Sequence, residues 1–280
     1  MRVDVAGHAV YAYTGSRAFD ASRPTIAFVH GAANDHSVWA LQSRYFAHHG
    51  RNVLAVDLPG HGRSEGAPLS SVASIADWLV GVLDVLKVEI VSLVGHSLGS
   101  LAVLDAASRH PERVERIALL GPSVPMPVSE ALLDAAKRDD HAAFEMINGW
   151  SFSPAAQLGG NRMPGVWMTG NSIRLMERAP QGALYADLAA CNSYADGLSA
   201  AAKVRCPALL IIGQRDQMTL PKNARALSVA LADQRVVTIP DCGHSLMVEA
   251  PDTVLDALRD FLPLPEGSGQ VAESRSRATR

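Results

Sequence analysis

A serine between two glycines is the first candidate for chemistry in this chain. Residues 95–99 read Gly-His-Ser-Leu-Gly, which fits the pattern G-x-S-x-G with Ser97 at its centre. The preceding "EIVSLVG" is an apolar run typical of a buried strand, and the following "SLAVLDAASR" has helical spacing. A serine on so tight a strand-to-helix turn has a strained backbone, and glycines on either side prevent collisions. The pattern predicts a nucleophile at Ser97, against the alternatives of a turn or helix-capping serine.

A serine nucleophile needs a general base and a group that orients the base. His244 lies in "PDCGHS", between the last predicted strand and the last predicted helix, and Asp216 ends the strand segment "LLIIGQRD". In a parallel sheet both segments open at the edge where Ser97 lies. Folds that place a serine nucleophile on a strand-to-helix turn of this kind have their triad in the chain order Ser, Asp, His. We therefore predict a triad of Ser97, Asp216 and His244; the alternative for Asp216 is a turn or helix-capping aspartate.

Two backbone N–H groups are candidates to stabilise an oxyanion. The N–H of Leu98 is at the start of a predicted helix, where it has no partner within the helix. The second is the N–H of Ala32 in "HGAANDHSVW", because Gly31 allows the chain to turn sharply after a strand. His30 is expected to hold this loop through side-chain hydrogen bonds.

The elements that must position these residues alternate between strand and helix. A hairpin is predicted over 3–15, strands over 25–31, 52–60, 90–95, 114–122, 206–216 and 234–240, and helices over 37–50, 71–87, 98–109, 221–231 and 246–262. The second helix is expected to be capped by Ser70 or Ser71, and Pro251 to break the last one. Continuous apolar strands between helices predict an α/β fold with a mostly parallel sheet covered on both faces.

Residues 123–203 interrupt this alternation, and they predict a helical insertion. The insertion contains five of the eight methionines and two of the four tryptophans. Thioether and indole side chains suit an adaptable apolar pocket, and the candidates for its wall are Trp150, Met146, Trp167 and Met168. The alternative is that they fill the space between small helices. We expect a core domain formed by 1–122 and 204–262, with a disordered tail at 263–280.

Composition excludes several function classes. The 280 residues are 48% hydrophobic and 19% charged, with a net charge of −3, which does not favour binding to nucleic acid or an anionic membrane surface. Three cysteines (Cys191, Cys206 and Cys242) match neither a disulfide framework nor a zinc motif. No apolar stretch reaches 18 residues, and the N-terminus does not read as a signal peptide. We expect a cytoplasmic protein with no metal, no organic cofactor and no membrane or nucleic-acid partner.

Five segments together resemble the α/β-hydrolase fold superfamily: "VHGAANDHSVW", "VDLPGHGRSEG", "LVGHSLGS", "IIGQRD" and "PDCGHSLMVEAP". The resemblance covers nearly all of 1–262 and implies an eight-stranded sheet with a helical cap. Haloalkane dehalogenases and most epoxide hydrolases have aspartate at the position of Ser97, so their reactions are not expected. The chain also lacks the "HGGG" segment of one esterase branch and the Gly-Pro-Gly segment of carbon–carbon bond hydrolases. It is most similar in pattern to bacterial carboxylesterases with a helical cap.

The sequence leaves three functions open. The first is hydrolysis of a small or medium, largely apolar carboxylic ester through an acyl-enzyme on Ser97. The second uses the same triad on a carbon–carbon bond of a vinylogous diketone or on an amide. The third is a ligand-binding, hydrolase-like receptor without turnover, against which a complete triad argues. All three imply a small-molecule partner, and the protein is expected to be a monomer or homodimer.

Overall fold

The computed structural model describes residues 1–160 and 165–264, so that most of the tail predicted to be disordered lies outside the described residues. Its centre is an eight-stranded, mostly parallel sheet, as predicted. The first two strands of the chain form an antiparallel hairpin, and the second of them is also antiparallel to its other neighbour. In sheet order the strands are β1 Arg2–Val5, β2 His8–Tyr13, β4 Asn52–Val56, β3 Thr25–Val29, β5 Val91–His96, β6 Val114–Leu120, β7 Ala208–Gly213 and β8 Gln234–Ile239.

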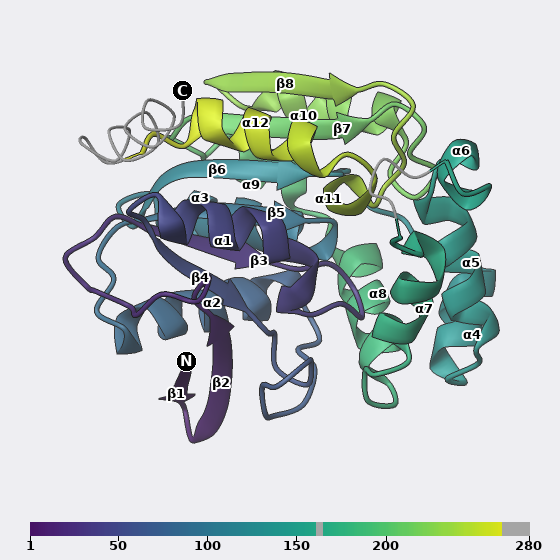
Figure 1. Ribbon diagram of the computed structural model, residues 1–280, viewed down its shortest axis with the longest axis horizontal. Coiled ribbons are helices and arrows are strands. Elements are labelled where there is room, and N and C mark those ends of the chain that lie inside the picture. The colour runs from purple at the N-terminus through teal and green to yellow at the C-terminus, as the bar shows by residue number, and fades with distance from the viewer. Residues whose placement is uncertain (161–164, 265–280) are drawn as a thin grey trace, which may run out of the picture.

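Helices cover both faces of this sheet (Figure 1). One core cluster joins the sheet to α2 (Val72–Val85), α3 (Leu98–Arg109) and α10 (Ala224–Ala230). A second cluster on the other face includes side chains of α1 (Ala40–His48) and α12 (Pro251–Phe261). Strands β3, β4, β5 and β7 are buried along their whole length, which explains why they are apolar on both faces.

The helix boundaries follow from local chemistry. Of the two serines expected to cap α2, Ser71 is the cap, because its side chain accepts a hydrogen bond from the N–H of Ser74 at 3.1 Å. Pro251 separates α11 (Leu246–Glu249) from α12, as predicted. Single 3₁₀ turns precede two helices: η1 (His36–Trp39) before α1 and η2 (Pro221–Asn223) before α10.

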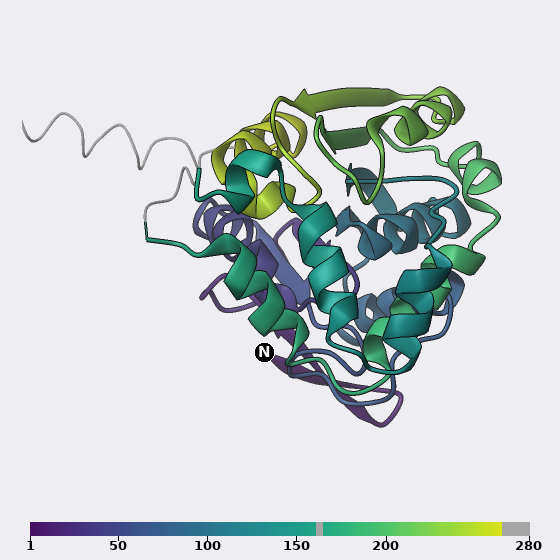
Figure 2. The same ribbon diagram turned by 90° about the vertical axis from the view of Figure 1, so that its right-hand side faces the viewer.

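Residues 123–203 contain helices and, among those that the structure describes, no strand. The helices are α4 Glu130–Lys137, α5 Ala142–Ser151, α6 Pro154–Gln157, α7 Met168–Met176, α8 Ala183–Ser193 and α9 Gly197–Ala201. We call α4 to α8 the cap helices: they lie beyond the carboxyl ends of the parallel strands, and Figure 2 shows them in front of that edge. α9 instead packs against α3 and α10 of the core. The cap helices therefore lie over the sheet edge where the predicted triad is expected.

Candidate active site

Ser97 occupies the turn between β5 and α3 in a strained conformation, with φ of +53° and ψ of −118°. This φ is in the region that side chains other than glycine rarely adopt. A Cβ atom at Gly95 would overlap the carbonyl of Gly99, and one at Gly99 would overlap the carbonyl of Val29. The Ser97 N–H donates to the carbonyl of Leu120 at 2.9 Å, which anchors the turn to the neighbouring strand. Both glycines of the motif are therefore required by close backbone contacts.

Asp216 and His244 form a buried pair in the loops after β7 and β8. His244 Nδ1 donates to Asp216 Oδ2 at 2.7 Å, and only 4% and 2% of the two residues are exposed. Thr219 Oγ1 donates to the same oxygen at 2.7 Å, and the N–H groups of Met218 and Thr219 donate to Oδ1, each at 2.8 Å. Burial raises the pKa of Asp216, but His244 and these hydrogen bonds outweigh it, so the net pKa is lowered. The carboxylate is therefore ionised and holds the imidazole by its Nδ1–H.

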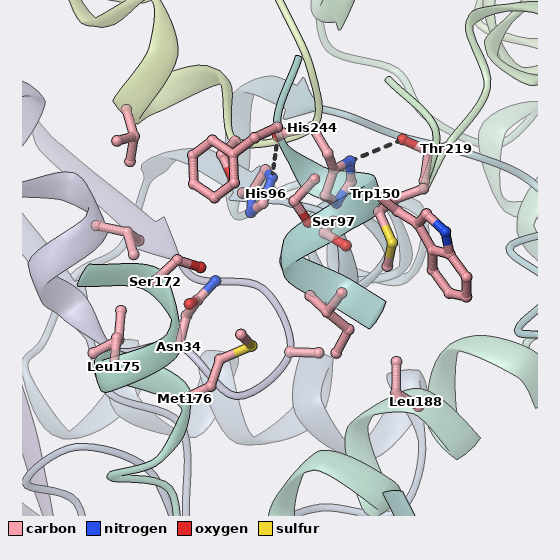
Figure 3. Close-up of a pocket in the computed structure, with 18 of the residues that line it drawn as sticks. Asn34, His96, Ser97, Trp150, Ser172, Leu175, Met176, Leu188, Thr219 and His244 are labelled. Carbon is pink, nitrogen blue, oxygen red and sulfur yellow. Dashed lines mark hydrogen bonds between the residues drawn. The ribbon is translucent and has the colours of Figure 1, made fainter. Parts of the chain in front are cut away.

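The His244 ring lies at the same cavity as Ser97 (Figure 3). A Cβ atom at Gly121 would come within 3.0 Å of this ring, so the glycine leaves room for it. The hydrogen bonds among the described residues do not include one between Ser97 Oγ and His244 Nε2. Such contacts are often long before substrate binds.

The backbone of the His244 loop is held from two sides. His96 Nε2 donates to the carbonyl of His244 at 2.9 Å, and the carbonyl of Ser151, at the end of α5, accepts from the N–H groups of His244 and Ser245 at 2.8 and 3.0 Å. Burial, with the nearby charge of His244, lowers the pKa of His96 to about 3, so the His96 ring is neutral. The insertion and the nucleophile turn therefore both position the candidate base.

The loop after β3 brings Ala32 next to the nucleophile. A Cβ atom on Gly31 would lie 3.2 Å from Ser97 Cβ, which shows how closely the loop approaches. As predicted, His30 holds the loop: its Nδ1–H donates to the carbonyl of Gly31 at 2.8 Å, and its Nε2 accepts from the N–H of Leu58 at 3.1 Å. Ala32 lines the cavity, and Leu98 begins α3 directly after Ser97.

A cavity of about 750 Å³ opens in front of Ser97 and is lined by both the core and the cap helices. Of the four wall residues proposed from the sequence, Trp150 and Met168 line it. Met146 and Trp167 are not among its described lining residues: Met146 packs in a cluster of cap helices, and Trp167 is 70% exposed. Four further methionines line the cavity: Met126, Met176, Met218 and Met247. The thioether wall is thus larger than the insertion alone provides.

Sequence reasoning missed two residues that hold the pair in place. Thr219 bonds Asp216, and its Oγ1 also lies 3.1 Å from His244 Nδ1. Its signal was the spacing in "DQMT", because a Thr three residues after an Asp can close a side-chain turn. His96 is the second; only its position before the nucleophile could have indicated it.

One group of residues has the composition of a metal site, and it lies outside the cavity. Asp35, His36 and Asp57 place one ligand atom each within 4.8 Å of one another. Each of the three side chains already has a structural partner: His36 Nδ1–H donates to Asp57 at 2.8 Å, and Asp35 accepts from the N–H of Ser37 at 2.8 Å. These bonds fit a role in holding the loops after β3 and β4. Separately, no helix in residues 1–160 and 165–264 is long and apolar enough to cross a membrane.

Comparisons with known proteins agree with this architecture. The chain is 29% identical to a pimeloyl-[acyl-carrier protein] methyl ester esterase of Aromatoleum aromaticum, over 86% of this chain and 99% of the relative. It is 30% identical to a 2-hydroxymuconate semialdehyde hydrolase of a Pseudomonas species, over 76% of each chain. The solved structure of an enol-lactonase from Burkholderia xenovorans superposes with a TM-score of 0.81 at 23% identity, over 94% of this chain and 99% of the other.

A family model extends these similarities to most of the chain. The model for the alpha/beta hydrolase fold matches residues 24–251, which include β3 to β8 and the segments with Ser97, Asp216 and His244. The protein therefore belongs to the α/β hydrolase fold family.

Proposed function

We propose that the protein hydrolyses a small or medium, largely apolar carboxylic ester through an acyl-enzyme on Ser97. The observation that carries the proposal is the buried Asp216–His244 pair, at 2.7 Å, beside the cavity that contains the strained serine. A site that only bound a ligand would not need this pair, because a base oriented by a carboxylate serves proton transfer. The arrangement therefore supports catalysis over a receptor function.

The proposed reaction has two steps. Ser97 Oγ attacks the ester carbonyl while His244 Nε2 accepts its proton, and the oxyanion that forms is received by the N–H groups of Ala32 and Leu98. The carbonyl re-forms, the C–O bond to the alcohol breaks, and His244 returns the proton to the departing oxygen. Water then attacks the acyl-enzyme with His244 as base and releases the acid. Asp216 stabilises the imidazolium formed in each step.

The cavity supports an apolar acyl group. Its wall contains aliphatic, aromatic and thioether side chains from both the core and the cap helices, among them Leu132, Trp150, Phe152, Met168 and Met247. Its volume of about 750 Å³ is within the usual range for small-molecule sites. We assign substrate selection to the insertion at 123–203, because it supplies much of this wall. The similarity to a methyl ester esterase favours the same bond type.

Labelling and rates test the proposal together. The folded protein is treated with a fluorophosphonate, the labelled residue is identified by mass spectrometry, and hydrolysis of p-nitrophenyl esters of increasing chain length is followed. We expect labelling at Ser97, and loss of both labelling and hydrolysis in Ser97→Ala. Ser108→Ala is the matched control, because Ser108 lies on α3 and its hydroxyl donates to the carbonyl of Asp105 in the same helix. Unlabelled Ser97 in active wild-type protein would overturn the assignment.

A second candidate is hydrolysis of a carbon–carbon bond in a vinylogous diketone. The 30% identity to a 2-hydroxymuconate semialdehyde hydrolase favours it. The same triad residues are proposed for it, so labelling of Ser97 does not separate the two. A panel of esters, amides and vinylogous diketones does: a kcat/KM for the diketones that exceeds that for the best ester would select this candidate.

A further inference from the structure

Asp187 is a buried carboxylate on α8 whose hydrogen-bond partners belong to the core. Only 1% of the residue is exposed. Its Oδ2 accepts from the N–H of Ala33 at 2.9 Å and from His61 Nε2 at 3.0 Å. Ala33 is in the loop after β3, and His61 is in the loop after β4. A single oxygen of the cap therefore binds two core loops.

The bond with His61 is buried on both sides. The Nδ1 atom of His61 lies 3.0 Å from the carbonyl of Pro59, and Nε2 faces the Asp187 carboxylate. Both partners offer acceptor oxygens, a geometry that suits a ring donating from both of its nitrogens. Burial lowers the pKa of His61, but the charge and hydrogen bond of Asp187 outweigh it and the net pKa is raised. A buried carboxylate paired in this way is held in one orientation.

The same oxygen fixes the loop that carries the proposed oxyanion donor. Ala33 has φ of +50°, a conformation that a residue with a side chain adopts only when its surroundings hold it. The peptide that carries the Ala32 N–H is held at its other end, because the carbonyl of Gly31 accepts from His30 Nδ1 at 2.8 Å and from the N–H of Asn34 at 3.2 Å. Two consecutive peptide groups are thus held in place. The Gly31–Ala32 peptide is held by core residues through its carbonyl, and the Ala32–Ala33 peptide is held by Asp187 through its N–H.

We propose that Asp187 is a positioning residue for the oxyanion hole: from α8 it fixes the peptide after Ala32, so that the Ala32 N–H faces the developing oxyanion. This inference rests on the proposed ester hydrolysis at Ser97. If Asp187 has this role, the oxyanion hole is complete only when the insertion at 123–203 is packed on the core. Asp187 is not among the described residues that line the cavity, so it acts through the backbone and not on substrate.

A positioning role predicts a specific kinetic pattern. Loss of one oxyanion donor costs about 10²–10³ in kcat. Because Asp187→Ala displaces this donor without deleting it, we expect kcat to fall by roughly 10- to 100-fold while KM changes less than about threefold. Asp187→Asn keeps an acceptor oxygen without the charge, and we expect a smaller loss in kcat.

The decisive measurement is the affinity for an aliphatic trifluoromethyl ketone. Ser97 Oγ attacks the carbonyl carbon of this inhibitor, and the hemiketal oxygen that forms lies in the oxyanion hole. The inhibition constant should rise in parallel with the loss of kcat/KM, in the order wild type, Asp187→Asn, Asp187→Ala. The matched control is Asp139→Asn, because Asp139 also accepts a backbone N–H, that of Gly182 at 2.7 Å, but within the cap. We expect the control to leave both values unchanged.

Each outcome decides between the alternatives. Folded Asp187 variants that bind the ketone as tightly as wild type would overturn the inference, as would a rise in KM that equals the rise in the inhibition constant. If Asp187→Ala does not fold, the same comparison on Asp187→Asn decides. Failure of the proposed function is distinguishable, because wild-type protein would then neither hydrolyse esters nor react at Ser97 with fluorophosphonate.

Discussion

Charge at the candidate site is decided by the neighbours of each residue. Burial alone would favour a neutral Asp216, but one imidazole, one hydroxyl and two backbone N–H groups make it an anion. Burial, together with the nearby charge of His244, outweighs the groups that would raise the pKa of His96 and lowers it to about 3, which keeps the ring neutral. Both residues are buried, but their partners differ. Asp216 is therefore a charged acceptor for His244, and His96 is a neutral donor to the His244 carbonyl.

Asp216→Asn tests the orienting role. An amide can turn its NH₂ towards His244, which favours the wrong tautomer, so we expect kcat for p-nitrophenyl esters to fall by about 10⁴. The control is Asp241→Asn, since Asp241 is an exposed aspartate in the loop after β8. A loss below tenfold in Asp216→Asn would show that another group orients His244.

The lowered pKa of His96 predicts that the fold becomes less stable in acid. The unfolded residue takes up a proton near its ordinary pKa of 6.5, whereas the folded residue stays neutral down to about pH 3. The unfolded state thus binds more protons between these values, so the free energy of unfolding falls as the pH is lowered through this range. This group alone contributes roughly 2 kcal/mol of that loss between pH 7 and pH 5.

Urea unfolding of wild type and His96→Gln at both pH values measures this contribution. We expect the variant to be less stable at pH 7, with a smaller loss on acidification. His30, whose pKa is lowered to about 4 by burial, sustains part of the dependence in both proteins. An equal loss in the two proteins would contradict the assignment to His96.

At the scale of elements, the nucleophile turn is built by close approach of β3, β5 and α3. The two glycines of G-x-S-x-G allow the first turn of α3 to pack against the backbone of both strands. The contact leaves no space for a methyl group, and the strain at Ser97 is borne by these surrounding elements. A substitution that loosens this packing should therefore lower the stability of the fold and also disturb the geometry of Ser97.

Gly99→Ala is expected to lower the free energy of unfolding by roughly 1–3 kcal/mol, because the added methyl overlaps the carbonyl of Val29. Hydrolysis should fall with it as the turn shifts. Gly81→Ala is the control within a helix: its Cβ would lie 3.7 Å from Val5, and alanine should stabilise α2 by about 0.5–1 kcal/mol. Denaturant unfolding of both variants tests the pair, and a neutral Gly99→Ala would contradict the close packing.

At the scale of the whole molecule, the candidate active site is assembled from two layers. The core contributes Ser97, Asp216 and His244 from the carboxyl edge of the sheet, and the cap helices lie in front of that edge (Figure 2). Side chains of both layers line the cavity. Hydrogen bonds cross between the layers at Ser151 on one side and at Asp187 on the other. The depth of the cavity is consequently set by packing between segments far apart in sequence.

Trp150→Ala should shift the preferred p-nitrophenyl ester towards longer acyl chains, because removal of the indole lengthens the cavity. Each additional buried CH₂ should add about 0.8 kcal/mol of binding. Trp167→Ala is the matched control, since Trp167 is 70% exposed and outside the described lining. The same chain-length optimum in wild type and Trp150→Ala would remove Trp150 from the acyl site.

Local sequence was sufficient to predict the fold and the positions of its main elements. Apolar runs, glycine stops and capping residues act within a few positions of one another, so α3, β5 and the break at Pro251 were predictable with little error. The candidate triad followed for a related reason: in a parallel sheet, residues after successive strands share one edge.

Tertiary structure alone decided which side chains face the cavity and which groups hold the pair. Trp150 and Met168 point into it whereas Met146 and Trp167 do not, because the packing of short amphipathic helices sets which face turns inward. The bridge from Asp187 joins residues 154 positions apart. The sequence by itself determined the candidate catalytic residues, because they lie in short turns at the ends of strands. The shape of the cavity in front of them was decided by the tertiary structure, because it depends on long-range packing that local sequence patterns do not encode.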